Sequence, residues 1–378
     1  MKQKAKMTDK EDIKMLWAYA FNEQEPFLSR YFDEFWNYEN ALIIKKEHEL
    51  CGALQKIPYT VSLRGGLFSA SYIVGVSVPQ KFRGQKYSTA LMQYCLQEQK
   101  TRGDAISLLI PFNYKFYEKL GYSLCYDLSI YETKPENLPD LESLCTIKKL
   151  SLKDYEILNE TYQTFCTAKN GYNTRTENDW KYIFFEHELY NGSIYAAIKD
   201  GKVCGYISYD KSGEDIYVRE FIYNDKDALY SLISFMKKHF TDVKKLKIRT
   251  AKDNLLTSLL KEKNVTYKIL PTVMARIVDI EKVLSKADIA DIKIKVSDNL
   301  ITENNGVYEK NGQAVIKTDK EEFDVALDIK ALTQLVFGYF SAFELYFLGE
   351  LDADAEIIKM LDKIFPKTKN YMNHIMEA

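Results

Sequence analysis

The stretch that decides the fold runs from Val76 to Met92 and reads VSVPQKFRGQKYSTALM. It begins as a β-strand, passes through an Arg-Gly turn, and continues from Tyr87 with apolar residues at helical spacing. A strand that turns directly into a helix leaves unpaired backbone N–H groups beside the positive end of the helix dipole. Because Arg83 and Lys86 add two cations, the stretch predicts a binding site for an anion such as a pyrophosphate. An ordinary solvated turn is the alternative interpretation.

The residues on either side of this stretch predict a mixed sheet flanked by helices. Amphipathic helices are expected at 9–21 and 26–38, and antiparallel strands joined by hairpins at 41–78. A strand, a helix and a closing strand are then expected at AISLLIPF (105–112), NYKFYEKLG (113–121) and YSLCYDLSIYE (122–132). Together these elements form a first domain, residues 1–144.

A second domain, residues 145–281, repeats the pattern of the first. GSIYAAIKDGKVCGYISY (192–209) parallels NALIIKKEHELCGALQKI (40–57), with an apolar strand, a turn, Cys-Gly and another strand. REFIYNDKDALYSLISFMKKHF (219–240) occupies the place of the strand, turn and helix at 73–95, but it has no Arg-Gly turn. The simplest explanation is a duplication in which the second, degenerate copy has lost its anion site.

A third domain, residues 282–378, has a different pattern. Strands are expected at IKIKVSD (292–298), GVYEK (306–310), QAVIKT (313–318) and DVALDI (324–329), and apolar helices at ALTQLVFGYFSAF (331–343) and AEIIKMLDKIF (355–365). The fold class predicted for the chain is therefore mixed α/β, with two tandem copies of one domain and a C-terminal α+β domain.

Composition argues against several classes of function. The 378 residues are 46% apolar and 28% charged, which is typical of ordered globular domains. Lys and Arg number 52 and Asp and Glu 54, so no net positive field attracts nucleic acid or an anionic membrane. The sequence has no signal-peptide pattern and no apolar run near ~18 residues, so we expect a cytoplasmic protein that does not insert into a membrane.

The cysteines and histidines predict no metal site. Six cysteines lie far apart without a C-x-x-C pair, and we expect them to be reduced thiols in apolar cores. The four histidines, His48, His187, His239 and His374, have neither metal-ligand spacing nor a carboxylate or cysteine partner nearby in the sequence. Structural or surface roles are expected for all four.

A second informative segment is PFNYKFYEKLGY, from Pro111 to Tyr122. A phenol has an unperturbed pKa of about 10, so at neutral pH it is protonated and can donate its proton to a departing thiolate. Tyr117 lies on the short helix after the next strand, close to where the reacting end of a ligand would lie if its phosphates sat at the turn. A tyrosine that only fills the core is the alternative.

Together the two segments resemble the GNAT superfamily of acetyl-CoA-dependent N-acetyltransferases. The matching residues are V-x-V at 76–78, R-G at 83–84, the helix after it, and N-x-x-F-Y-E-K-L-G-Y at 113–122. The resemblance implies that acetyl-CoA is the cosubstrate, that no metal takes part, and that Tyr117 is the general acid. It also implies a cofactor site. The pantetheine arm would lie on Val76, Ser77 and Val78, and Phe112 and Asn113 would line the slot. The residues implied to hold the pyrophosphate are Arg83, Gly84, Gln85, Lys86, Tyr87, Ser88 and Thr89.

The turn departs from the family pattern R-x-x-G-x-G/A at two positions, where Lys86 and Ser88 replace small residues. A left-handed backbone at Lys86 would cost on the order of 1 kcal/mol. The departure therefore bears on how tightly the cofactor binds.

The order of the three domains resembles the enhanced intracellular survival (Eis) family, whose last domain is similar to sterol-carrier-protein folds. The resemblance covers essentially the whole chain, and residues 331–351 are its most specific piece outside the first domain. It implies an enzyme that acetylates a primary amine of a small cationic or polyamine-like acceptor, which in some members is an aminoglycoside. It also implies a homo-oligomer, which in some members is a hexamer.

In that family the terminal carboxylate, here on Ala378, is the base that takes the amine proton. Another carboxylate or a water relay is the alternative at this step. Two functions of other classes remain open for the whole chain. One is a binding protein that holds an apolar ligand in its third domain, and the other is a sensor that binds acetyl-CoA without turning it over.

Overall fold

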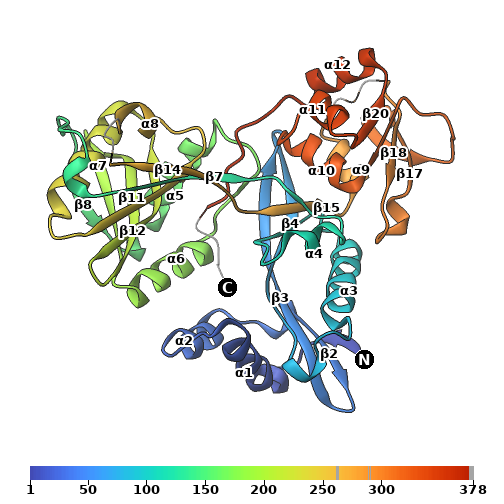
Figure 1. Cartoon of the computed structure of the whole chain (residues 1–378), viewed down its shortest axis with the longest axis horizontal. Helices are drawn as coiled ribbons and strands as arrows, with labels where there is room; N and C mark the ends of the chain where they lie inside the picture. The colour runs from blue at the N-terminus through green and yellow to red at the C-terminus, as the bar shows by residue number, and fades with distance from the viewer. Residues whose placement is uncertain (261–263, 288, 290, 374–378) are drawn as a thin grey trace. The chain divides into compact units, whose positions relative to one another are not determined.

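A computed structural model describes residues 1–260, 264–287, 289 and 291–373 of the chain (Figure 1). These residues divide into two compact units. Unit 1 consists of residues 1–126 and 272–370, and unit 2 consists of residues 127–271 and 371–373. The two units are therefore interleaved along the sequence.

Unit 1 contains the mixed sheet that carries the strand-to-helix turn. Its strands, in spatial order, are β1 (Lys2–Lys4), β2 (Ala41–Lys46), β3 (Glu49–Leu63), β4 (Gly66–Ser77), β5 (Ile106–Leu109), β15 (Met274–Ile277) and β6 (Ser123–Leu124). β4 and β5 pair in parallel, and the other neighbours pair antiparallel. The helices around it are α1 (Lys10–Phe21), α2 (Phe27–Glu34), α3 (Tyr87–Arg102) and α4 (Tyr114–Glu118), with short 3-10 turns η1 (Met7–Asp9), η2 (Tyr38–Asn40) and η3 (Gln80–Phe82).

Helices cover both faces of this sheet because successive side chains on β3 point to opposite sides. Gln55 accepts a hydrogen bond from the Tyr31 hydroxyl on α2 at 2.6 Å, whereas the next residue, Lys56, pairs with Glu98 on α3 at 3.7 Å. α3 packs against β2, β3 and β4 and buries Leu91 in the core beneath the turn. The turn is thus fixed between a buried strand and a buried helix face.

The expected closing strand at 122–132 is divided between the two units, which corrects the sequence analysis. Its first part forms β6, but β7 (Asp127–Thr133) pairs with β13 (Lys245–Ala251) and β14 (Thr266–Pro271) in unit 2. In unit 1 the neighbour of β5 is instead β15, which the chain reaches only after unit 2. The apolar run does not distinguish the two sheets, because a strand buried on both faces has no solvent side to mark it.

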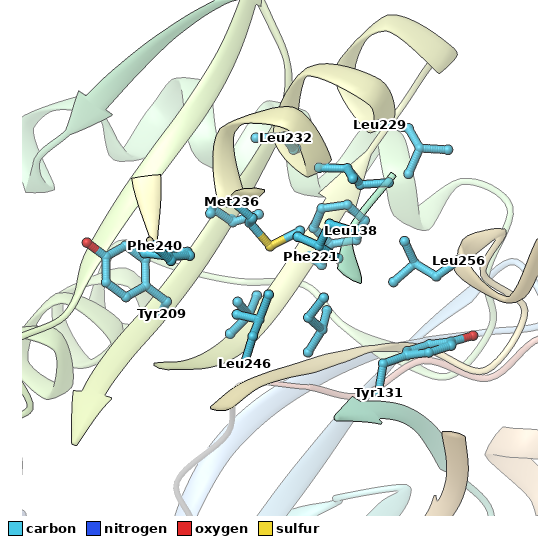
Figure 2. Packing of buried hydrophobic residues seen from close by; sticks show 14 of the residues in the cluster. Tyr131, Leu138, Tyr209, Phe221, Leu229, Leu232, Met236, Phe240, Leu246 and Leu256 are labelled. Carbon is cyan, nitrogen blue, oxygen red and sulfur yellow. The ribbon is translucent and has the colours of Figure 1, made fainter. Parts of the chain in front are cut away.

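Unit 2 is built on a second mixed sheet. In spatial order it consists of β14, β7, β13, β12 (Asp215–Tyr223), β11 (Lys202–Ser212), β10 (Ser193–Lys199) and β8 (Thr146–Leu150), with β12 and β13 parallel. The remaining elements are η4 (Pro135–Asn137), η5 (Leu152–Asp154), α5 (Tyr155–Cys166), β9 (Tyr172–Asn173), α6 (Glu177–Leu189), α7 (Lys226–His239) and α8 (Leu256–Leu259). Figure 2 shows Leu232 and Met236 of α7 packed with Phe221 and Leu246 of the sheet, which forms the core of this unit.

The C-terminal part of unit 1 has its own sheet, in the order β18 (Ala314–Thr318), β17 (Gly306–Asn311), β16 (Ile294–Ser297), β19 (Val325–Asp328) and β20 (Leu351–Ala353). Its helices are α9 (Ile280–Leu284), α10 (Ile329–Phe337), α11 (Ala342–Phe347) and α12 (Ala355–Ile364), with the 3-10 turn η6 (Thr302–Asn304). A buried ion pair ties it to the first sheet, because Arg276 on β15 donates to both carboxylate oxygens of Asp298 at 2.6 and 2.7 Å.

The helix expected at 331–343 is broken, which is a second correction. α10 ends where Gly338 adopts a left-handed backbone with φ of 64°. α11 then starts afresh at Ser341, whose hydroxyl accepts from Glu344 N while the Glu344 carboxylate accepts from Ser341 N. The apolar periodicity continues across both helices, so it does not report the break.

Among the helices within residues 1–260, 264–287, 289 and 291–373, none combines the length and apolar character that a bilayer span requires.

Candidate functional site

The end of β4 carries a bulge that shapes the candidate site. Val74 pairs with Gln55 and Ser77 pairs with Ala53, so two residues of β4, Gly75 and Val76, lie opposite a single residue of β3. Gly75 has a φ of +69°, which favours glycine. A Cβ at this position would also lie 2.2 Å from Cζ3 of Trp17 on α1. The bulge therefore requires glycine for both backbone and packing reasons.

β4 and β5 separate just where the bulge begins. Their parallel pairing runs from Ala70↔Ile106 to Ile73↔Leu109 and ends there. Beyond this point Val76 and the residues after it follow the bulge, whereas the chain after β5 runs on toward α4. The backbone of β4 that faced β5 is thus released from the ladder at the residues for which the sequence predicts pantetheine contacts.

The turn after β4 presents backbone N–H groups at the start of α3. Gly84 has a φ of +77° with open space where a Cβ would stand, and Lys86 is left-handed with φ 63° and ψ 17°. The left-handed backbone whose cost was considered from the sequence is therefore present at Lys86. Among the described residues no side chain caps this helix. Gly84, Gln85 and Lys86 are exposed, while Tyr87, Ser88 and Thr89 are half-buried.

The charges around this turn are basic. Arg83 lies over the ring of Tyr19 on α1 at 5.7 Å, which holds the guanidinium beside the turn. Lys81 forms an ion pair with Glu49, and Lys86 is the last residue before the helix. Uncapped N–H groups, the helix dipole and these cations together favour an anion at this place.

The corresponding helix of unit 2 has the opposite chemistry. α7 follows β12 as α3 follows β4, but the carboxylate of Asp225 accepts a hydrogen bond from Ala228 N at 2.7 Å. Asp227 stands in the first turn as well and pairs with Lys199. A carboxylate therefore caps one N–H at the start of α7, and the two acidic side chains there repel a phosphate.

Tyr117 lies on α4 with its ring buried, 3% exposed. Asn113 starts the helix, because its Oδ1 accepts a hydrogen bond from Phe116 N at 3.0 Å. Phe112 is largely exposed and meets the Tyr117 ring edge-on, with 5.4 Å between centroids. Burial raises the pKa of Tyr117 well above 10, so its phenol is protonated at neutral and mildly alkaline pH.

Several of the predicted site residues meet in one apolar cluster of unit 1. Tyr117, Leu91 and Tyr122 are buried members, and Val76 and Tyr87 pack against it. The end of β4, the start of α3 and the candidate acid are thus brought together, although they are up to 41 residues apart in sequence. The Asn113 side chain accepts the capping bond from Phe116 N, and its carbonyl accepts from Tyr117 N at 3.4 Å. Ala378 lies outside the described residues.

Two features of the chain were not predicted from its sequence. An isolated glycine inside a strand pattern, Gly75, is a signal of a bulge, but nothing in the sequence indicated that Trp17 would be its neighbour. In unit 2, His187 has the partners that sequence proximity did not reveal, because its ring nitrogens lie 2.8 Å from Asp210 Oδ1 and 2.7 Å from Ser208 Oγ. All three groups are buried, so they satisfy one another inside the fold.

Comparison with known families identifies three domains. Residues 3–125 match an acetyltransferase (GNAT) domain, residues 171–277 match a second model of an acetyltransferase (GNAT) domain, and residues 280–373 match a sterol carrier protein domain. Comparison of the sequence with curated proteins gives no match.

Solved structures resemble the chain over its whole length. A GCN5-related N-acetyltransferase from Anabaena variabilis has 22% identity and a TM-score of 0.88 over 98% of each chain. One from Kribbella flavida has 17% identity and a TM-score of 0.84, over 98% of this chain and 97% of that one. Eis1 from Mycobacterium abscessus has 19% identity and a TM-score of 0.79 over 97% of each chain. At these identities the likeness establishes a shared fold.

Proposed function

We propose that this chain, which belongs to the GNAT acetyltransferases, transfers the acetyl group of acetyl-CoA to a primary amine of a small cationic acceptor. The observation that carries the proposal is the uncapped N-terminus of α3 beside the separated ends of β4 and β5. The reaction class, N-acetyl transfer with an acyl-CoA cosubstrate, is that of the family. The acetyl donor, the acceptor and the roles of individual residues are the proposed part.

The cosubstrate fits the first GNAT domain better than the second. N–H groups from Gly84 to Thr89, with Arg83 and Lys86 beside them, suit the diphosphate of CoA. Val76 to Val78, released from β5, offer backbone groups to the amides of the pantetheine arm. Exposed Phe112 is available to contact the arm from the α4 side. The carboxylate on the start of α7 argues against a second site.

Tyr117 is the proposed general acid. The unprotonated amine attacks the thioester carbonyl, the carbon–sulfur bond breaks, and the Tyr117 phenol donates its proton to the departing thiolate. Holding amine and thioester together supplies a large part of the acceleration. The raised pKa of Tyr117 supports this role, because the phenol stays protonated over the whole range in which amines become nucleophilic.

Tyr117→Phe tests this assignment, since it removes the proton and keeps the ring. We expect kcat to fall by about 10²- to 10⁴-fold with little change in KM for acetyl-CoA. Tyr94→Phe on α3 is the matched control, because it removes a phenol that packs against the same cluster but is not assigned to the site. Equal kcat in the wild type and Tyr117→Phe would remove Tyr117 from the mechanism.

The terminal carboxylate of Ala378 is the proposed base for the amine proton. Extending the chain by a few residues moves this carboxylate away from its position without touching any other group. We expect the extension to lower kcat/KM, whereas the same extension at the N-terminus leaves it unchanged. If both extended proteins are fully active, another carboxylate or a water relay takes the proton.

The acceptor is best identified directly. Mass spectrometry of a panel of polyamines, aminoglycosides and simple primary amines, after incubation with protein and acetyl-CoA, would show which ones gain an acetyl group. We expect cationic primary amines to be acetylated in preference to neutral amines of the same size. We also expect a cytoplasmic homo-oligomer, in keeping with a cosubstrate made inside the cell.

A further inference from the structure

The end of α4, the helix that carries Tyr117, is held by an arginine from another strand. α4 is closed by left-handed Gly121, with a φ of +79°, and by Tyr122 N, which donates back to the Tyr117 carbonyl at 3.1 Å. The carbonyl just before the glycine belongs to Leu120. It accepts a hydrogen bond from Nη1 of Arg276 on β15 at 2.7 Å. The helix therefore depends on β15 for the partner of this carbonyl.

The Arg276 guanidinium fills the space that a side chain at position 121 would need. A Cβ on Gly121 would lie 1.6 Å from Nη1 and 2.8 Å from Cζ of Arg276. Arg276 is fully buried, so water does not compete for the Leu120 carbonyl. The end of α4 and the guanidinium are therefore fitted to each other, and a shift of one displaces the other.

The other side of the guanidinium is held by the sterol carrier protein domain. Nη2 of Arg276 donates to the two carboxylate oxygens of Asp298 at 2.7 and 2.6 Å. Asp298 is buried and is fixed in turn, because it accepts from Leu300 N at 2.9 Å, Ile301 N at 3.1 Å and Asn304 Nδ2 at 2.9 Å. A continuous series of contacts thus runs from the backbone of that domain to α4.

Stability alone is a weak reason for this ion pair. Removing two charges from water costs about as much as their attraction returns, and an apolar pair of similar volume is often as stable. The Arg276 guanidinium carries a further cost, because its Nε is buried and has no hydrogen-bond partner among the described residues. An ion pair with these costs is better explained by what it holds in place.

The Tyr117 hydroxyl is not fixed by a polar partner of its own. Burial is the only cause of the raised pKa of Tyr117, and no group in the described part of the chain hydrogen-bonds to its hydroxyl. The position of this oxygen is therefore set by the packing of the ring and by the backbone of α4.

We propose that Arg276 and Asp298 are positioning residues for acetyl transfer, which hold the end of α4 and thereby place the Tyr117 hydroxyl at the departing sulfur. The inference rests on the proposed function, in which Tyr117 is the acid. A displacement of about 1 Å at a catalytic group can lower a rate by about 10²-fold. The sterol carrier protein domain thus takes part in the chemistry of the first domain, in a role that requires no apolar ligand.

Arg276→Lys tests the positioning role, because an ammonium keeps the charge but lacks the planar fork that joins the Leu120 carbonyl to Asp298. Assayed well below its melting temperature, the variant should lose about 10- to 100-fold in kcat, with KM for acetyl-CoA almost unchanged. Asp298→Asn should lose less, since one oxygen still accepts from Nη2. This second variant carries the test if Arg276→Lys does not fold.

Arg64→Lys is the matched control. Arg64 also joins the first sheet to the sterol carrier protein domain, because it donates to the carbonyls of Leu335 and Pro366 at 3.2 and 3.0 Å. It precedes β4, whereas the candidate site follows that strand. We expect Arg64→Lys to lower the melting temperature and to leave kcat unchanged.

The same substitution in Tyr117→Phe separates positioning from general damage. If Arg276 acts through Tyr117, Arg276→Lys should have almost no further effect on kcat once the phenol is gone. An equal loss of kcat in both backgrounds would overturn the proposal. So would full kcat in a folded Arg276→Lys protein.

Hydrogen exchange distinguishes a failure of this inference from a failure of the proposed function. In Arg276→Lys, peptides covering residues 113–122 should exchange at least tenfold faster, and peptides covering 87–102 at the wild-type rate. If Tyr117→Phe keeps full kcat, the acid assignment fails, and exchange alone decides whether the ion pair holds α4. Wild-type exchange at 113–122 would overturn the inference in either case.

Discussion

The anion site of the first GNAT domain can be tested by giving it the charge that the second domain has. Ser88→Asp places a carboxylate in the first turn of α3, as Asp227 does in α7, where Asp225 also caps the helix. An acid in the first turn stabilises a helix by about 0.3–1 kcal/mol, so the variant should fold at least as well as the wild type. Any loss of binding is then a loss of the site and not of the fold.

The size of the effect follows from Coulomb's law. The diphosphate of CoA carries roughly two negative charges, and a carboxylate roughly 6 Å away repels it by about 1.4 kcal/mol in bulk water. The repulsion is about four times larger at an effective dielectric constant of 20, the value typical near a protein surface. Because Ser88 is half-buried, we expect at least a tenfold increase in the dissociation constant of CoA.

Gln97→Asp is the control, because it adds the same charge to an exposed position of the same helix. The two positions are nine residues apart, about 13 Å along the helix, which exceeds the Debye length of about 8 Å at physiological salt. Calorimetric titration with CoA should give less than a twofold change for this variant. Wild-type affinity in a well-folded Ser88→Asp protein would refute the reasoning.

Three further outcomes are expected. Gly75→Ala should lower the free energy of unfolding by about 3 kcal/mol or more, because the new methyl group clashes with Trp17 and the backbone is left-handed. Gly84→Ala has open space for its methyl group, so it should cost only about 1 kcal/mol. Similar denaturant midpoints for the two variants would contradict the clash. Asp298→Ala should cost about 3–5 kcal/mol in urea unfolding, because it leaves the Arg276 guanidinium buried without its counter-charge, and a loss below about 1 kcal/mol would argue against the pair. Burial raises the pKa of the buried tyrosines above 10, so the stability that they contribute is complete below pH 10 and is lost as pH rises further. Melting temperatures should therefore fall steeply from about pH 10 upward. Tyrosinate absorbance should appear together with unfolding and not before it.

The local elements of the site could be predicted from sequence because their signals are local. The strand, Arg-Gly turn and helix at 76–92 lie within seventeen residues, and each has its own periodicity. The departure of Lys86 from the family's small-residue pattern raised the question of a left-handed backbone at this position, and the structure has one there. The three-domain composition and the mixed α/β class are confirmed by the family matches.

The pairing of distant segments could not be predicted in the same way. β7 and β15 are each short buried strands, and their sequences do not indicate which of two similar sheets they join. The contact between Gly75 and Trp17 joins residues 58 positions apart, and steric fit of this kind leaves no pattern in either segment. Likewise, the break at Gly338 depends on one residue inside a continuous apolar periodicity.

The central claim is that the backbone from Gly84 to Thr89 binds the diphosphate of coenzyme A. Calorimetric titration of the wild-type protein with acetyl-CoA, and separately with acetyl-pantetheine, which lacks the diphosphate, tests it most directly. We expect acetyl-CoA to bind in the micromolar range and acetyl-pantetheine at least 100-fold more weakly. Equal affinity for the two compounds, or no binding of acetyl-CoA at millimolar concentration, would contradict the claim.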